Sequence, residues 1–297
     1  MATINEHFHP RGTLSRDGWE SVVDAALPNW RYTGIHVADL DRGARQLPAA
    51  AVERLVVPLS GGCRVSVGTT TTELQGRTRV FDGPSDAMFV GVGQSLDISG
   101  HGRVAVCSAP TATVKANRYI ARSEVPVELR GAGRDTRQVH NFGTPEALDA
   151  GALIVCEVLT PAGNWSSHPG HKHDEVVPDG ETYLEEIYYF EAAPARGIGA
   201  PPDADPFGSF STYSSSAGEI ETRALVRTGD IALVPFGYHG PAAAAPEYDL
   251  YYLNVMAGPV RSWQFSDDPA QAWIRGSWAD QTPDPRLPFR PAEEAIR

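Results

Sequence analysis

A chain of 297 residues is long enough for two domains of ordinary size or for one large all-β unit. Hydrophobic residues make up 41% of it and charged residues 21%, a balance that predicts sizeable cores and excludes global disorder. The net charge of -12 repels phosphate backbones and anionic headgroups, so no nucleic acid and no membrane is expected as a partner. The N-terminus shows no basic segment followed by an apolar run, and no apolar run in the chain has membrane-spanning length. These features predict a cytoplasmic protein.

Short apolar segments bounded by Gly, Pro or Asp recur along the chain and predict strands. From the N-terminus they cover residues 57–68, 87–92, 103–109, 153–160, 184–190, 230–235 and 248–257. Thr144 and Pro145 predict a short helical turn over 144–149, and the tail 267–297 is expected to be a packed, irregular arm. Many short strands with frequent turns favour a sandwich or a barrel.

The three cysteines, Cys63, Cys107 and Cys156, each lie in a strand-like apolar run. None of them forms a C-x-x-C pair, so a disulfide framework and a cysteine-based zinc site are not expected. We predict buried free thiols, which suit a reducing compartment.

Two segments of the chain resemble each other. Asp86 and Asp230 each precede four apolar positions, with a glycine seven residues after the aspartate. Nine residues after Asp230 comes His239, whereas the first copy has a serine at that place. A duplicated β-domain is the simplest explanation, and it divides the chain into residues 1–145 and 146–297.

The segment 168–190 carries the clearest chemical pattern. His171 and His173 are two residues apart, so on a strand both imidazoles face the same side and can ligate one ion. Such a pair alone is a weak indication, because histidine pairs are also common on surfaces. Further ligands must therefore come from neighbouring strands.

Adjacent carboxylates and a third histidine supply those ligands. Glu185 and Glu186 begin a strand-like run, and only one of them can face inward. His239 follows a Pro-x-Gly turn at the start of another strand. Three histidines and one carboxylate suit zinc or another first-row divalent ion, with a position left for water or substrate.

These residues resemble the cupin superfamily, whose pattern is His-x-His, a nearby Glu, and later Gly, Pro-x-Gly and His. Gly229, Pro235, Gly237 and His239 match the second part. The first part departs from the pattern, because a longer segment that resembles an inserted polar hairpin precedes the glutamates. The resemblance implies Glu185 as the ligand and Glu186 as the alternative. The hairpin carboxylates that could compete with them are Asp174, Glu175, Asp179 and Glu181.

The resemblance narrows to one family. The runs HKHDE, TYLEEIYYF, VPFGYHG and YDLYYLNVMAGPV, with RDTRQVHNF near the domain junction, resemble the 5-deoxy-glucuronate isomerases of bacterial inositol catabolism. The related 5-keto-4-deoxyuronate isomerases share this pattern. Two positions depart from it: Gly240 replaces a usual proline, and Phe236 replaces a residue that is often basic.

That resemblance implies a bicupin, with two double-stranded β-helix (jelly-roll) barrels in one chain. The first barrel would be metal-free, and the second would hold a divalent ion on His171, His173, Glu185 and His239. Zinc is the expected ion, with manganese, iron and nickel as alternatives. The implied reaction converts 5-deoxy-D-glucuronate to 5-dehydro-2-deoxy-D-gluconate by moving a proton from C2 to C1 through an enediol. The ion would act as a Lewis acid.

Three residues are candidates for proton transfer: Glu157, Glu186 and Tyr251. Glu157 interrupts an apolar strand, where an unpaired carboxylate would be costly, and a salt bridge is its alternative role. Tyr251 lies in the strand 248–257, where a place in the core is the alternative.

The substrate is a small sugar acid, whose carboxylate needs a cationic partner. Arg137, His140 and Lys172 are candidates for that contact, and Asn254 is expected to bind a hydroxyl. For Arg137, an inter-domain salt bridge is the alternative. Exposed barrel edges also predict a homo-oligomer.

Two other functions fit the same sequence: an Fe(II) cupin dioxygenase and a non-enzymatic sugar-binding bicupin. The first would consume oxygen, which an isomerase does not. The second would usually have degraded metal ligands, whereas all four candidates are present here.

Overall fold

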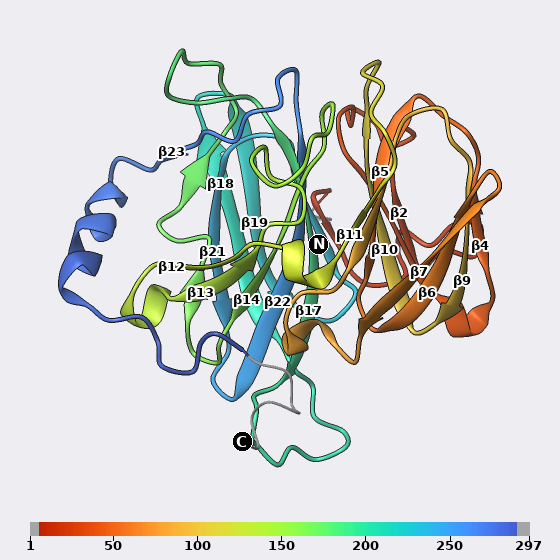
Figure 1. Ribbon diagram of the computed structural model, residues 1–297. Helices are drawn as coiled ribbons and strands as arrows, with labels where there is room; N and C mark the ends of the chain where they lie inside the picture. The colour runs from red at the N-terminus through yellow and green to blue at the C-terminus, as the bar shows by residue number, and fades with distance from the viewer. Residues whose placement is uncertain (1–5, 290–297) are drawn as a thin grey trace.

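Four antiparallel β-sheets form the body of the protein in the computed structural model, which describes residues 6–289 (Figure 1). Each half of the chain contributes one larger and one smaller sheet, and the two halves lie side by side. This confirms the all-β prediction. The described residues contain no helix long and apolar enough to cross a membrane.

The first half forms the sandwich drawn in orange and yellow in Figure 1. Its larger sheet has the order β11 (Arg118–Ile120), β8 (Ala87–Val90), β5 (Val52–Pro58), β10 (Arg103–Pro110), β3 (Gly34–Asp39) and β2 (Ser21–Val23). Its smaller sheet has the order β4 (Arg45–Leu47), β9 (Leu96–His101), β6 (Gly61–Val67) and β7 (Thr70–Arg77). Val56, Met88 and Ile98 are among the side chains that fill the space between these sheets.

The second half repeats this arrangement. Its larger sheet has the order β1 (Phe8–His9), β20 (Ile231–Val234), β17 (Glu185–Pro194), β22 (Tyr248–Ala257), β14 (Ile154–Thr160), β13 (Arg137–His140) and β12 (Val127–Arg130). Its smaller sheet has the order β19 (Gly218–Val226), β18 (Gly208–Ser215), β21 (Tyr238–Ala244), β16 (His171–Lys172) and β23 (Ser266–Asp267), with β15 (Trp165–Ser166) paired to β21. Tyr188, Phe190 and Tyr252 pack between these sheets.

The two larger sheets face each other across a third core. Because side chains alternate along a strand, β17 and β22 present one set of residues to each core. Ile187, Tyr189 and Leu253 pack against Leu55 and Phe89 of the first half. The opposite faces of the same strands line the space between the two sheets of the second half, and we call each such pair of sheets a barrel. Strand register therefore decides which side chains reach the interior of the second barrel.

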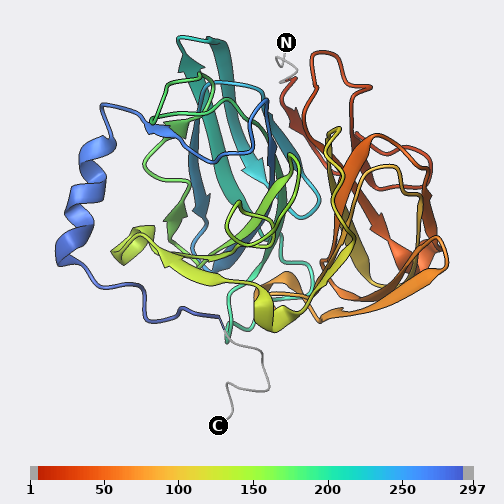
Figure 2. The ribbon, with the colours of Figure 1, turned by 45° about the horizontal axis from the view of Figure 1, so that its top comes forward.

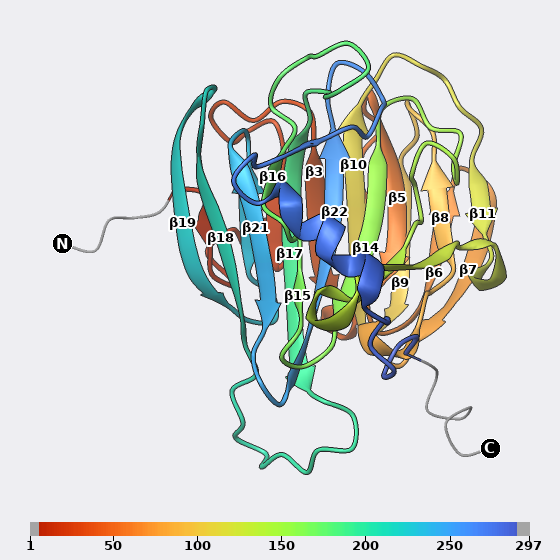
Figure 3. The same cartoon turned by 90° about the vertical axis from the view of Figure 1, so that its left-hand side faces the viewer.

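Short 3₁₀ helices connect the strands, and a longer one follows them. Among the described residues these are η1 (Leu40–Arg42), η2 (Val80–Asp82), η3 (Arg122–Glu124), η4 (Gly133–Asp135) and η5 (Ala272–Asp280). In Figures 2 and 3, η5 lies on the outer side of the second half, away from the first half. This helix belongs to the tail for which an irregular arm was predicted; residues 290–297 of that tail lie outside the described residues.

The predicted strands agree with the structure, with one exception. The segment 57–68 is two strands, β5 and β6, because the chain reverses at Gly61, whose φ is 70°. A Cβ at Gly61 would lie 2.3 Å from the carbonyl oxygen of His101, so only glycine fits there. At 144–149 the chain forms the predicted short turn, in which the backbone N–H groups of Ala147 and Leu148 both donate to the carbonyl oxygen of Thr144. All three cysteines are buried and free, as predicted.

The strand orders agree with an internal repeat, since β8 follows Asp86 and β20 follows Asp230 at equivalent places in the two larger sheets. The domain boundary at residue 145 stays a prediction. It falls between β13 and β14, which pair in one sheet, so β12 and β13 belong by hydrogen bonding to the second barrel.

Candidate metal centre

Glu186 points into the second barrel and meets two histidines there. It shares a face of β17 with Tyr188 and Phe190, and its Oε2 lies 3.0 Å from Nε2 of His173 and 3.1 Å from Nε2 of His239. Ligand atoms of these three residues all lie within 4.8 Å of one another, and each residue is buried. The sequence brings them together from three places: the end of β16, the start of β17 and β21.

Each histidine in this region is oriented by a backbone carbonyl. Nδ1 of His173 lies 2.9 Å from the oxygen of Leu184, and Nδ1 of His239 lies 3.3 Å from the oxygen of Gly237. Donation from Nδ1–H fixes the tautomer in which Nε2 carries the lone pair that binds metals. The rings are therefore held with Nε2 directed toward Glu186.

The electrostatics of the cluster fit a bound cation. Burial alone would raise the pKa of Glu186, but the adjacent imidazoles of His173 and His239 outweigh burial and lower the pKa to about 2. Nε2 of His239 is buried and has no well-directed hydrogen-bond partner among the described residues. A buried carboxylate with an unsatisfied imidazole nitrogen beside it is a donor set suited to a first-row divalent ion.

His171, the first histidine of the pair, lies beside this cluster. Its ring centroid is 4.4 Å from that of His239 and 6.5 Å from that of His173, and its Nδ1 lies 3.2 Å from the oxygen of Pro169. Burial, followed by the neighbouring His239 and His173, holds the pKa of His171 well below its usual value, so the ring is neutral. The structure thus places His171 next to the group formed by Glu186, His173 and His239.

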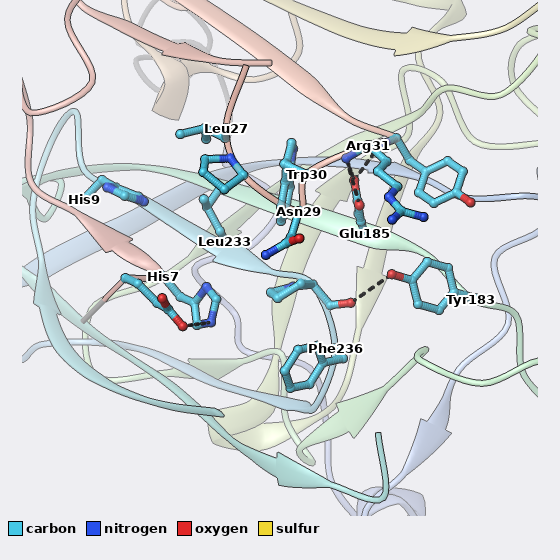
Figure 4. A pocket seen from close by; sticks show the side chains of 14 residues that line it. His7, His9, Leu27, Asn29, Trp30, Arg31, Tyr183, Glu185, Leu233 and Phe236 are labelled. Atoms are coloured by element: carbon cyan, nitrogen blue, oxygen red, sulfur yellow. Dashed lines mark hydrogen bonds and ion pairs between the residues drawn. The ribbon is translucent and has the colours of Figure 1, made fainter. Parts of the chain in front are cut away.

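Glu185, the expected carboxylate ligand, lies on the opposite face of β17. Its oxygens accept backbone hydrogen bonds from Arg31, at 3.0 and 3.1 Å, and from Tyr32, at 2.6 Å. Figure 4 shows this contact in a cavity of about 610 Å³, where Tyr183 also donates to the carbonyl of Pro235. The carboxylate position must therefore be corrected from Glu185 to Glu186, because strand alternation directs only Glu186 to the histidines.

The inserted hairpin does not contribute ligands; it fixes the loops that carry them. Lys172, between the two histidines, is buried and forms ion pairs with Asp174 at 2.7 Å and Glu181 at 3.0 Å. Asp174 also accepts the backbone N–H of Gly237 at 2.8 Å, two residues before His239. Lys172 is thus engaged within the protein, and its predicted contact with substrate is not supported by its position.

Three predicted site residues lie together in the core between the two barrels. Arg77 of the first barrel forms a two-pronged ion pair with Glu157 at 2.6 and 2.7 Å. His140 and Tyr251 contact the same carboxylate, with Tyr251 donating at 2.7 Å. Burial would raise the pKa of Glu157, but Arg77 lowers it to about 2.

This network corrects three expectations. Glu157, His140 and Tyr251 point to the face of their sheet opposite Glu186. Side chains alternate along a strand, and the residue next to each of these three faces the barrel interior. Their polar groups are engaged with one another, with Arg77 and, through Nε2 of His140, with Gln138. Sequence reasoning missed Arg77, which lies in the other half of the chain.

Asn254 and Arg137 share the inward face of the large sheet with Glu186. Asn254 lies directly opposite Tyr188 on the neighbouring strand, and its Nδ2 is buried with no partner among the described residues. Tyr188 packs 5.1 Å from Tyr252 and 6.0 Å from His239, measured between ring centroids. Tyr188 is two residues after Glu186, so the alternation of side chains along a strand predicts that both face the barrel interior. Sequence reasoning did not consider Tyr188.

The sequence is similar to those of several known proteins. The model of the KduI/IolB family matches residues 8–274. The chain is 40% identical over 273 residues to a 5-deoxy-glucuronate isomerase of Geobacillus kaustophilus (strain HTA426), covering 90% of this chain and 95% of that protein. It is 39% identical over 253 residues to a protein of the same name from Geobacillus thermodenitrificans (strain NG80-2), covering 84% and 88% of the two chains.

Solved structures show the same likeness. An IolB-like protein from Salmonella typhimurium LT2 superposes with a TM-score of 0.80 at 33% identity, over 90% of this chain and 98% of that chain. Lactobacillus farciminis oxalate decarboxylase superposes with a TM-score of 0.60 at 10% identity, over 90% of each chain, a likeness of fold alone.

Proposed function

The chain belongs to the KduI/IolB family, and from that premise we propose that it converts 5-deoxy-D-glucuronate to 5-dehydro-2-deoxy-D-gluconate in myo-inositol catabolism. The observation that carries the proposal is the buried group of Glu186, His173 and His239 inside the second barrel. An aldose–ketose interconversion needs stabilisation of an enediolate, and this donor set suits an ion able to provide it.

The proposal includes a divalent ion held by His171, His173, Glu186 and His239. When bound, the ion would supply Lewis-acid stabilisation of the sugar's carbonyl and hydroxyl oxygens. Neutral imidazoles and one carboxylate favour zinc, and manganese, iron or nickel are the other outcomes of a metal analysis.

The chain's own residues orient the ligands and the sugar. Backbone carbonyls aim the imidazoles, and Asp174 holds the turn before His239. The free amide nitrogen of Asn254 faces the same interior and is suited to donate to a sugar hydroxyl. We assign no proton-transfer role to Glu157 or Tyr251, because both are occupied in the core between the barrels.

One experiment tests the function directly. The purified protein is analysed for metal and then followed by NMR with 5-deoxy-D-glucuronate in deuterated buffer. We expect about one divalent ion per chain, formation of the ketose, loss of activity after chelation, and recovery when the ion is restored. Undiminished turnover by a metal-stripped preparation would contradict the proposed metal dependence, and oxygen consumption would favour a dioxygenase instead. Metal without turnover of any sugar would favour a binding protein.

We also propose that the enzyme is a cytoplasmic homo-oligomer. β7 and β19 are edge strands of the two smaller sheets, with one side of each backbone ladder unpaired within the described chain. Such edges favour association between copies, and the three free cysteines suit a reducing compartment. Light scattering after size-exclusion chromatography should give a mass above the 32.0 kDa of one chain, and a monomer would overturn this proposal.

A further inference from the structure

A second cavity, of about 630 Å³, opens beside the candidate metal centre. It lies between β12, β13 and the segment 261–278. Four arginines (Arg130, Arg137, Arg261 and Arg275), two glutamates (Glu128 and Glu146) and several aromatic rings line it. One of these rings, Phe265, lies 4.8 Å from the ring of His171, measured between centroids. The cavity is therefore adjacent to the histidine cluster, and its four arginines outnumber its two glutamates in a protein whose net charge is -12.

Among the described residues, Arg137 and Arg261 are the two of these four arginines that lack an acidic partner, and Arg261 instead donates to backbone oxygens outside the cavity's strands. Arg130 pairs with Glu128 at 2.9 Å, and Arg275 pairs with Asp267. Arg137 is 8% exposed, donates to the backbone oxygen of Asp135 at 3.0 Å, and makes no ion pair with any residue of the described chain.

The carboxylate of Asp135, which acts electrostatically on Arg137, is already engaged. Asp135 forms an ion pair with His168 at 2.7 Å and accepts from Nε1 of Trp278 at 3.1 Å. The guanidinium of Arg137 lies over the ring of Trp278, 5.6 Å from its centroid. It is therefore held in place by contacts that leave its charge uncompensated.

The position of Arg137 is electrostatically costly without an anion. Arg130 and Arg137 stand directly opposite each other on β12 and β13, where like charges destabilise a strand pair. Burial lowers the pKa of Arg137 to about 10, and Arg130 and Arg275 act in the same direction against the opposing effect of Tyr252. Gly131 allows this close packing, because a Cβ there would lie 2.2 Å from the carbonyl oxygen of Asp135 and 2.7 Å from Nη1 of Arg137.

We propose that Arg137 binds the carboxylate of the sugar-acid substrate in this cavity, so that the other end of the sugar reaches the Glu186 cluster. The inference rests on the proposed function for the identity of the acid. Arg137 is inward-facing on the same sheet as Glu186, and the planar guanidinium matches a carboxylate in a two-pronged contact. The acid supplies the missing negative charge.

The test compares an acid and a neutral sugar of the same shape. Values of kcat/KM are measured for 5-deoxy-D-glucuronate and 5-deoxy-D-glucose, which differ only in the carboxylate, with wild-type protein, Arg137→Met and Arg137→Lys. We expect Arg137→Met to lower the preference for the acid by roughly 100-fold while leaving the neutral sugar almost unaffected, and Arg137→Lys to retain part of the preference. Arg134→Met, an exposed arginine of the same segment, is the matched control and should keep the wild-type preference.

The outcomes separate a failure of the role of Arg137 from a failure of the proposed function. If Arg137→Met turns over the acid with an unchanged preference, Arg137 does not bind the carboxylate, even though the proposed function stands. If wild-type protein turns over neither sugar, the proposed function fails, and calorimetric affinities for the same two sugars then test Arg137 alone. If Arg137→Met does not fold, as judged by circular dichroism, the neutral variant Arg137→Gln carries the test, and an unchanged preference there overturns the inference.

Discussion

Glu185 and Glu186 have the same side chain, yet β17 directs one to backbone amides and the other to two imidazoles. Replacing each by glutamine separates these environments. Glu186→Gln should lose the bound metal and lower kcat/KM by at least roughly 100-fold, because a neutral amide is a poor ligand in place of a carboxylate.

Glu185→Gln is the matched control for that change. It should keep the metal and lose about 1–3 kcal/mol of unfolding free energy, because the amides of Arg31 and Tyr32 lose part of a charged acceptor. Elemental analysis and urea titration of both variants make the comparison. Loss of metal from Glu185→Gln alone would restore the expectation that the sequence pattern favoured.

The same pair shows how far sequence reasoning extends to the site. The spacing of His171 and His173 and the turn before His239 are local patterns, and they pointed to residues that the structure brings together. The choice between Glu185 and Glu186 depended on strand register after an insertion of unusual length, which no local pattern fixes. A shift of one residue exchanges the two faces.

The inserted hairpin connects the two loops that carry the histidines of the cluster. Asp174 joins Lys172, which lies between two histidines, to the backbone of Gly237 before the third. We expect Asp174→Asn to weaken metal affinity by roughly 10-fold, because loss of the charge loosens both loops that carry ligands. Competition with a chelator of known affinity measures the change.

Asp179→Asn is the control within the same hairpin. Asp179 is exposed and has a φ of 58°, a conformation that asparagine also adopts readily, so its replacement should leave metal affinity unchanged. Equal effects of the two substitutions would mean that the hairpin acts through its overall charge and that the contacts of Asp174 are unimportant.

Strand positions were predictable where the apolar pattern was continuous, as in β22, whose predicted and observed bounds agree. Strand pairing was not predictable, because it joins residues that are distant in sequence. The juxtaposition of Arg130 with Arg137 depends on how β12 meets β13, and neither was predicted as a strand. The cationic cavity could therefore not be predicted from the sequence, although Arg137 itself was a candidate for binding the substrate's carboxylate.

At the scale of the molecule, the ion pair between Arg77 and Glu157 joins the two barrels inside their common core. Arg77 holds the pKa of Glu157 at about 2 against the effect of burial, whereas a glutamate in the unfolded chain has a pKa of about 4.3. The pair therefore contributes its full stability above about pH 4.3 and loses it as the pH falls toward about 2. Urea midpoints measured from pH 7 to pH 2.5 should fall more steeply for wild-type protein than for Glu157→Gln in that window. Parallel curves would show that the pair does not govern acid unfolding.

Glu157→Gln also distinguishes a structural role of Glu157, as a contact between the barrels, from a role as a catalytic base. Glutamine leaves Arg77 buried beside a neutral group, so the variant should lose about 3–5 kcal/mol of unfolding free energy. Glu73→Gln, at an exposed ion pair with Arg64 in the first barrel, should lose about 1 kcal/mol or less. Assayed well below its lowered midpoint, Glu157→Gln should keep most of its kcat, because the carboxylate faces the core between the barrels, on the side of the sheet opposite Glu186. A base would behave in the opposite way, with kcat reduced by about 100-fold or more and the thermal midpoint little changed. Because Tyr251 and His140 contact the same carboxylate, an effect on kcat alone would also reinstate them as candidates for the reaction.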